Sequence, residues 1–363
     1  LVGSEMCIRD SSTICDYRKG KVDVATLTHL SYISTENMLP NKGGITSAAS
    51  LPTISQTQEY RKGDVLVSNI RPYFKKIWKA KTDGGCSNDV LVFAAKDGTD
   101  PDFLYYVLAD DSFFEYSMAT SKGTKMPRGD KTSIMRYQVP AIDISTQRRI
   151  ASILRSLDDK IELNTAINNN LTEQARSIYQ SWFIDYEPFG RTMPLDWIPS
   201  SLGGVATMKT DSWSPSKNPE TIVEHYSIPA YDEKHYPVFE IASGIKSNKY
   251  ILTPDSVMIS KLNPDTKRIW RPMCLSAHPI CSTEFIVYEA KKAAQKDFVY
   301  SILDSAPFLN FLCSHTTGST NSRQRATPKA TLDFPIMLPP DSIIEEFCQI
   351  VSPMYDLLSL IHI

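Results

Sequence analysis

The sequence predicts an α+β fold made of two similar mixed α/β domains, each followed by a long helix. Three observations lead to this prediction. The chain repeats itself once, short apolar runs alternate with helical stretches in both copies, and residues 146–182 contain neither proline nor glycine. A chain of 363 residues is also expected to hold about two domains.

The repeat is clearest in four pairs of segments. VLVSNIRPYFKKIW (65–78) matches VMISKLNPDTKRIW (257–270), and CSNDVLVF (86–93) matches CSTEFIVY (281–288). DFLYYVL (102–108) matches DFVYSIL (297–303), and KGTKMPRGDK (122–131) aligns with TGSTNSRQRA (317–326), which places Arg128 on Arg323. This period is far too long for a solenoid and indicates a duplicated domain-plus-helix unit.

Apolar runs give the expected elements of each copy. Strands are predicted at 65–70, 90–94, 137–140, 257–262, 285–288 and 334–338, and helices at 102–117 and 297–312. The resulting domains are 12–143 and 188–340, followed by helices over 144–187 and 341–358. The opening of the second copy, DWIPSSLGGVATM (196–208), has no counterpart in the first, so we expect the first domain to have lost its opening segment.

Both ends of the chain look foreign to this fold. LVGSEMCIRDS (1–11) and the closing LSLIHI resemble translated sequencing-adapter artefacts. Residues 1–11 and 359–363 are therefore predicted to be artefacts that lie outside the fold.

The long helix between the domains carries a heptad seam with two polar exceptions. The seam positions are Ile150, Leu154, Leu157, Ile161, Asn164, Asn168, Leu171, Ala175 and Ile178. An unpaired buried amide costs about 1–3 kcal/mol, so Asn164 and Asn168 favour a single alignment with a partner helix. The helix, about 50 Å long at ~1.5 Å per residue, would then act as a spacer of fixed length. The alternative is that both amides face solvent.

Local signals mark where the two long helices begin and break. Ser145 can cap the start of the first helix. Pro353 should kink or restart the second.

Composition excludes several classes of protein. The net charge of −2 rules out a uniformly basic polyanion binder, so a nucleic-acid surface would have to be local. Seven cysteines without a C-x-x-C pair fit a reducing cytoplasm. No apolar run is long enough to span a membrane.

The motifs of common enzymes are missing as well. The sequence lacks both nucleotide-phosphate loops, metal-ligand spacings of histidine, and a methyltransferase N-P-P-Y loop. A weak metal-nuclease pattern joins Asp255 to Glu289 and Lys291, but the first copy has Ala95 and Lys96 where the carboxylate should be.

Basic residues recur at matching places in both copies. Such recurrence favours two similar surfaces for DNA phosphates, although a solvated loop with scattered charge is the alternative. The candidate DNA-binding residues are Arg71, Lys75, Lys76, Lys122, Thr124, Lys125 and Arg128 in the first copy, and Lys267, Arg268, Arg271, Ser319, Thr320, Arg323 and Arg325 in the second. Arg128 and Arg323 are the preferred base readers, because arginine can pair bidentately with guanine.

An aromatic and acidic segment, SWFIDYEPF (181–189), ends the long helix. Trp182, Phe183, Asp185 and Tyr186 could form a protein-partner patch, because aromatic residues are enriched in interface cores. Equally, they could dock the end of the helix onto its neighbouring domain.

Taken together, these segments resemble the specificity subunit of type I restriction-modification systems. The resemblance rests on SLDDKIELN, WFIDYEP, EHYSIPAYDE, SKLNPDTKRIW and TTGSTNSRQRATP and covers about Ile14 to Tyr355. It implies two target-recognition domains that each read half of a split site in double-stranded DNA, held apart by antiparallel coiled-coil spacers.

The resemblance also implies partners and cofactors. Two modification (methyltransferase) subunits would bind the spacers and carry S-adenosylmethionine, and restriction (translocase-nuclease) subunits would use ATP and Mg. The chain itself would hold no cofactor or metal and would be non-catalytic. A fused restriction or methylation enzyme and a coiled-coil scaffold without a DNA role remain alternatives.

Overall fold

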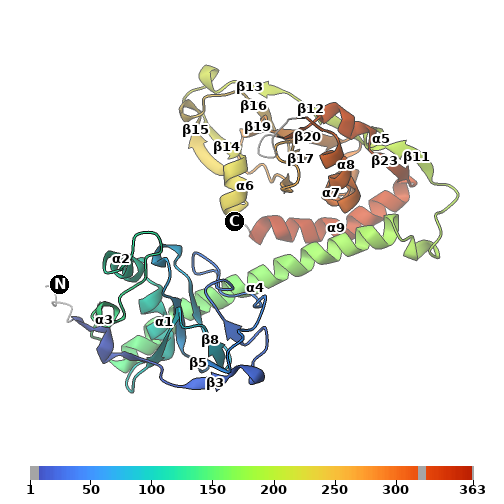
Figure 1. Cartoon of the computed structure of the whole chain (residues 1–363). Coiled ribbons are helices and arrows are strands. Elements are labelled where there is room, and N and C mark those ends of the chain that lie inside the picture. Colours follow the sequence, from blue (N-terminus) through green and yellow to red (C-terminus); the bar gives the residue numbers. More distant parts are fainter. Residues whose placement is uncertain (1–7, 318–323, 362–363) are drawn as a thin grey trace. The chain divides into compact units, whose positions relative to one another are not determined.

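The computed structural model describes residues 8–317 and 324–361. The chain divides into two compact units at the Glu162–Leu163 bond, which lies inside helix α4 (Ile144–Phe183) (Figure 1). The predicted long helix is confirmed. Its predicted cap is wrong, because the side chain of Asp143 accepts the N–H groups of Ser145 and Thr146 at 2.9 and 3.0 Å.

The first unit contains two four-stranded sheets and a two-stranded ribbon. The antiparallel sheet has the order β2 (Cys15–Tyr17), β9 (Val90–Ala95), β6 (Val65–Ser68) and β7 (Ile77–Lys79). The mixed sheet has the order β3 (Lys21–Asp23), β5 (Gln56–Tyr60), β8 (Gly84–Cys86) and β4 (Tyr32–Ile33), with β4 parallel to β8. β1 (Ile8–Asp10) pairs with β10 (Gln138–Pro140), and the helices are α1 (Pro101–Ala109), α2 (Asp111–Ala119) and α3 (Lys131–Ile134).

The antiparallel sheet is buried on both faces. Val65 and Val67 join a cluster with Leu104 and Phe113 of the helices, whereas Leu66 packs into a second cluster with Tyr60 of the mixed sheet. Successive side chains of a strand point to opposite faces, so one strand serves both layers. This explains why β6 has a continuous apolar sequence.

The second unit repeats this architecture. Its antiparallel sheet has the order β12 (Ala206–Lys209), β20 (Phe285–Ala290), β17 (Ser256–Ser260) and β18 (Ile269–Trp270). Its mixed sheet has the order β13 (Ser212–Trp213), β16 (Lys249–Ile251), β19 (Pro279–Ser282), β14 (Ile222–Tyr226) and β15 (Val238–Ile241), with β14 parallel to β19. Two further pairs of strands are β11 (Ile198–Ser201) with β23 (Pro335–Leu338) and β21 (Thr316–Thr317) with β22 (Arg325–Ala326). The α-helices are α5 (Leu202–Val205), α6 (Ile228–Lys234), α7 (Lys296–Asp304), α8 (Ala306–Ser314) and α9 (Asp341–Ile361).

The predicted α+β class and strands are confirmed, but each predicted helix between strands is two helices. The breaks fall at Asp110 and Ser305, which are extended and cap the helix that follows through the N–H groups of Ser112 and Phe308. A side chain that caps a helix start competes with continuation of the preceding helix. The apolar periodicity alone does not reveal these breaks.

The opening of the first unit is also different from the expectation. Ile8–Asp10 pairs with β10 as Ile198–Ser201 pairs with β23, and Cys15–Tyr17 pairs with β9 as Ala206–Lys209 pairs with β20. Residues 8–17 are therefore the structural counterpart of the second unit's opening segment, 196–208, for which the sequence comparison found no equivalent. Residues 8–11, expected to lie outside the fold, take part in it.

Within the second unit, α9 lies antiparallel to the end of α4 (Figure 1). The rings of Phe183 and Phe347 are 4.9 Å apart, and Arg176 and Tyr355 line one cavity further along both helices. Pro353 lies inside α9, which continues to Ile361, so it does not restart the helix. Among the described residues, no helix is both long and apolar enough to cross a membrane.

Candidate nucleic-acid interface

In each unit, two loops that are distant in sequence are joined through their backbones. We call residues 69–75 and 261–267 the first loops, and residues 121–130 and 317–326 the second loops. The N–H of Arg71 donates to the carbonyl of Pro127 at 2.8 Å, and the N–H of Asn263 donates to the carbonyl of Gln324 at 2.9 Å. Two basic segments predicted separately thus form one structure in both units.

This hydrogen-bond pattern corrects the sequence alignment of the second loops. Ile70 forms a bridge with Arg128, and its counterpart Leu262 forms one with Arg325. Arg128 is therefore equivalent to Arg325, and the alignment with Arg323 is wrong. In sequence, Arg325 follows its partner Thr317 by eight positions, whereas Arg128 follows its partner Lys122 by six. The second loop of the second unit is therefore two residues longer. An ungapped comparison could not detect this.

An ion pair at the base of the second loop is present in both units. Arg128 lies 3.2 Å from Asp89, and Arg325 makes a bidentate pair with Glu284 at 3.0 and 3.1 Å. Asp89 and Glu284 are themselves aligned in the repeat, within CSND and CSTE. These two arginines, predicted to bind DNA, thus hold the second loop against the strand end.

A second shared ion pair joins a sheet to a helix. Lys79 pairs with Asp102 in the first unit, and the equivalent Arg271 pairs with Asp297 at 2.6 and 3.2 Å in the second. The Arg271 side chain is only 15% exposed and also contacts Asp356 at 2.8 Å. Its charge is therefore used within the protein.

The remaining basic candidates of the second unit are also neutralised. Arg268 makes a bidentate pair with Asp232 at 2.7 and 2.9 Å, and Lys267 pairs with Asp304. Burial lowers the pKa of Lys267, although Asp304 opposes this shift. A desolvated, paired lysine is poorly placed to meet a DNA phosphate. Ser319, Thr320 and Arg323 lie outside the described residues.

The basic candidates of the first unit are more exposed. Lys75 and Lys42 both pair with Asp111, and these contacts lower the pKa of Asp111 to about 2. Lys76 donates to the carbonyl of Thr35 at 2.6 Å. Lys122 pairs with Asp130 at 2.5 Å but remains exposed. These lysines could exchange an internal partner for a phosphate.

Three further candidates, two of them exposed and Arg71 half-buried, belong to the same loops. Thr124 and Lys125 are exposed in the turn between the paired residues Lys122 and Arg128. Arg71 has a left-handed backbone, with φ of 50°, and within the described part of the chain it takes part in no ion pair. Tyr73 and Phe74 beside it are also unusually exposed, at 49% and 37%. The first loop of this unit therefore presents cationic and aromatic groups together.

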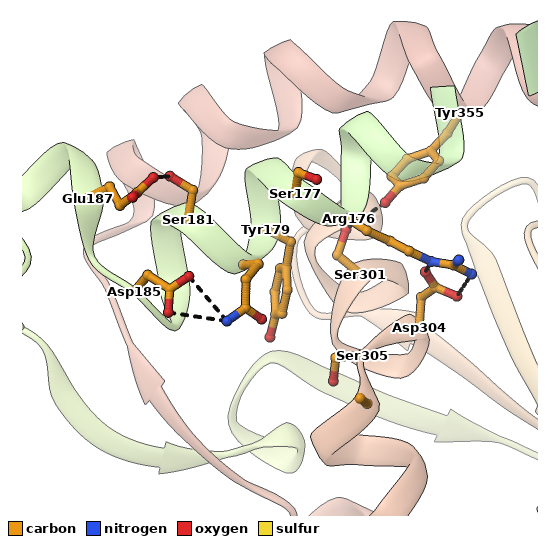
Figure 2. A pocket seen from close by; sticks show the side chains of 12 residues that line it. Arg176, Ser177, Tyr179, Ser181, Asp185, Glu187, Ser301, Asp304, Ser305 and Tyr355 are labelled. Atoms are coloured by element: carbon orange, nitrogen blue, oxygen red, sulfur yellow. Dashed lines mark hydrogen bonds and ion pairs between the residues drawn. The ribbon is translucent and has the colours of Figure 1, made fainter. Parts of the chain in front are cut away.

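The aromatic residues predicted as a partner patch are used mainly inside the second unit. Phe183 is 7% exposed in the core, and Trp182 and Tyr186 pack against that core. Asp185 lies at the rim of a cavity of about 470 Å³, where it accepts from Gln180 (Figure 2). This placement matches the alternative, in which the helix end docks onto its own domain.

The predicted register residues differ from one another. Asn164 is exposed, whereas Asn168 is half-buried and its Oδ1 atom is enclosed with no hydrogen-bond partner among the residues described. The weak nuclease pattern finds no support in geometry, because Glu289 accepts from Thr253 at 2.6 Å and pairs with Lys209 at 3.0 Å. Where the structure describes the chain, no group of three or more His, Cys, Asp or Glu side chains could hold a metal ion.

Together, the fold and the paired loops define a protein made of two copies of one loop-bearing α+β unit. Residues 9–173 match the family model described as the type I restriction modification DNA specificity domain.

Two curated relatives agree with the family model. The chain is 30% identical over 177 residues to the Type I restriction enzyme HindI specificity subunit of Haemophilus influenzae, a match that covers 46% of this chain and 38% of that protein. It is 28% identical over 151 residues to the Type I restriction enzyme MjaIX specificity subunit of Methanocaldococcus jannaschii, covering 39% of this chain and 34% of that protein. The match thus spans little more than a third of either relative.

A solved structure extends the likeness in fold to the whole chain. The S subunit of the type I restriction-modification system of M. genitalium aligns over 99% of this chain and 92% of its own, with a TM-score of 0.66 and 15% sequence identity. At this identity the likeness concerns the fold alone.

Proposed function

We propose that this chain is the DNA sequence-recognition subunit of a type I restriction-modification complex, and that each unit reads one half of a bipartite site. The observation that carries the proposal is the duplicated pair of loops, with the same backbone bonds and the same arginine–carboxylate pair in both units. Two equivalent surfaces on one chain suit two contacts with one duplex.

In this proposal, α4 and its antiparallel neighbour α9 are spacers that fix the gap between the half-sites. Ala175 and Ile178 of the predicted seam pack into the core that also contains Phe347 of α9. Further toward the start of α4, Leu157 and Ile161 of the same seam lie on one face of the helix and are 51% and 63% exposed. An apolar stripe on a long helix is typical of a coiled-coil seam. Asn164 and Asn168 would set its register.

The proposal assigns the chemistry to other subunits. Two modification subunits would bind the spacers and the segment around Asp185, bringing S-adenosylmethionine, and restriction subunits would use ATP and Mg. This chain would be non-catalytic and would work with them in the cytoplasm. Lys76, Lys122, Thr124 and Lys125 are the proposed contacts with DNA phosphates in the first unit, and Arg128 and Arg325 position the loops.

Selection from a library of random duplexes tests the proposal. The full chain should enrich a bipartite site with a constant gap, and its affinity should fall about tenfold or more between 50 and 200 mM salt, as for two or more phosphate contacts. Binding without sequence selection, or selection of a single contiguous site, would contradict the proposal. Methyl transfer or cleavage by the purified chain alone would instead indicate a fused enzyme.

A further inference from the structure

One position in the first loops is unusual in the same way in both units. Arg71 and Asn263 are equivalent residues of the repeat, each directly before a proline, Pro72 or Pro264. Both have a left-handed backbone, with φ of 50° and 46°. Asparagine adopts this conformation readily, but arginine does so rarely. Backbone preference therefore does not explain why arginine occupies this position in the first unit.

Both side chains also carry an enclosed polar atom without a partner. Within the described residues, no hydrogen bond reaches the buried Nε of Arg71 or the buried Oδ1 of Asn263. Buried polar groups in proteins are nearly always hydrogen-bonded, so an exception needs an explanation such as a water, an ion or a functional contact. The same exception at equivalent positions of two units points to a shared role.

The surrounding loop holds both residues in place. Their N–H groups donate to the second loop, at 2.8 Å to Pro127 and 2.9 Å to Gln324. The following loop residues, Lys75 and Lys267, are engaged with carboxylates. Arg71 and Asn263 thus combine a backbone that is held by the second loop with a side-chain atom that has no hydrogen-bond partner among the described residues. A residue whose backbone is held in place is well suited to a specific ligand contact.

We propose that Arg71 and Asn263 are the base-reading residues of the two units. This inference rests on the proposed function. Arginine pairs bidentately with the O6 and N7 atoms of guanine, and asparagine with the N6 and N7 atoms of adenine, both in the major groove. The first unit therefore requires a guanine in its half-site and the second an adenine, and one difference between aligned residues makes the two half-sites unlike.

Exchange of the two residues tests this assignment. The full chains with Arg71→Asn and with Asn263→Arg are each taken through selection from random duplexes, beside the unaltered chain. Arg71→Asn should weaken the preference for one guanine in one half-site by roughly 5- to 150-fold, the value of one bidentate contact. Asn263→Arg should do the same to one adenine in the other half-site and leave the first half-site unchanged.

Two control measurements distinguish a loss of base recognition from a loss of folding and from a simple loss of positive charge. Asparagine tolerates a left-handed backbone, so Arg71→Asn should keep the thermal unfolding midpoint of the parent. Arg148→Asn removes the same charge from an exposed site on α4 and should leave every base preference unchanged. Weaker binding to all sequences, with unchanged base preferences in Arg71→Asn, would overturn the assignment while the bipartite site persists. If the unaltered chain selects no bipartite site, the proposed function fails first and this inference with it.

Discussion

Replacing Phe347 with alanine should lower the free energy of unfolding of the second unit by about 3–5 kcal/mol, the usual cost of a buried Phe→Ala change. Phe347 is fully buried, and its ring centroid lies 4.9 Å from that of Phe183 and 6.1 Å from those of Tyr179 and Trp182. These three residues belong to α4, whereas Phe347 belongs to α9. The substitution would leave a cavity at the place where the two helices meet.

Urea unfolding followed by tryptophan fluorescence measures this effect, because Trp182 and Trp197 belong to or pack against the same aromatic cluster. Leu357→Ala on the same helix is the matched control, since Leu357 is 50% exposed and should change stability by no more than about 0.5 kcal/mol. Equal effects of the two substitutions would mean that α9 is not packed against α4 as described.

Replacing Asp304 with alanine should destabilise the second unit by about 3 kcal/mol, because two cations then lose their buried partner. The carboxylate of Asp304 accepts from Arg176 of α4 at 2.6 and 3.1 Å (Figure 2). It also pairs with Lys267 of the first loop. The side chain of Asp304 is 6% exposed and that of Lys267 is 23% exposed, whereas Arg176 is 52% exposed, so Lys267 has the least access to water as a replacement acceptor. The change would affect both the helix and the loop.

An exposed ion pair in the same unit provides the control. Glu187 pairs with Arg191 at 3.1 Å, and both side chains are at least 47% exposed, so Glu187→Ala should cost about 0.5 kcal/mol or less. Thermal unfolding of both variants decides the comparison. An Asp304→Ala variant as stable as Glu187→Ala would show that Asp304 does not anchor α4 and the first loop.

The sequence supports the fold well where periodicity and repetition coincide. The apolar pattern predicts the long helix and the strands at 65–70 and 257–262. The alignment of the repeat predicts that Cys86 and Cys281 occupy equivalent strands of the two units. The helix breaks at Asp110 and Ser305 do not, because capping depends on the local backbone and leaves the apolar period unchanged.

The candidate site is harder to predict from the sequence, because a sequence shows which residues are charged but not which of them form ion pairs in the folded protein. Arg268 and Arg271 appear as free cations in their segment, but their partners Asp232 and Asp297 lie 36 and 26 residues away. Asn263, the proposed base reader of the second unit, carries no charge and therefore gives no such signal in the sequence. The signal that could have indicated the shared ion pair was the aligned acids Asp89 and Glu284.

Insertion of one heptad into α4 tests the central claim most directly. Seven residues added between Glu162 and Leu163 lengthen the helix by ~10.5 Å, which corresponds to about three base pairs of duplex. Selection from random duplexes with the lengthened chain should return the same two half-sites with a gap about three base pairs longer. If the bases of either half-site change while the gap stays constant, α4 does not act as the spacer between two reading units, and the account is wrong.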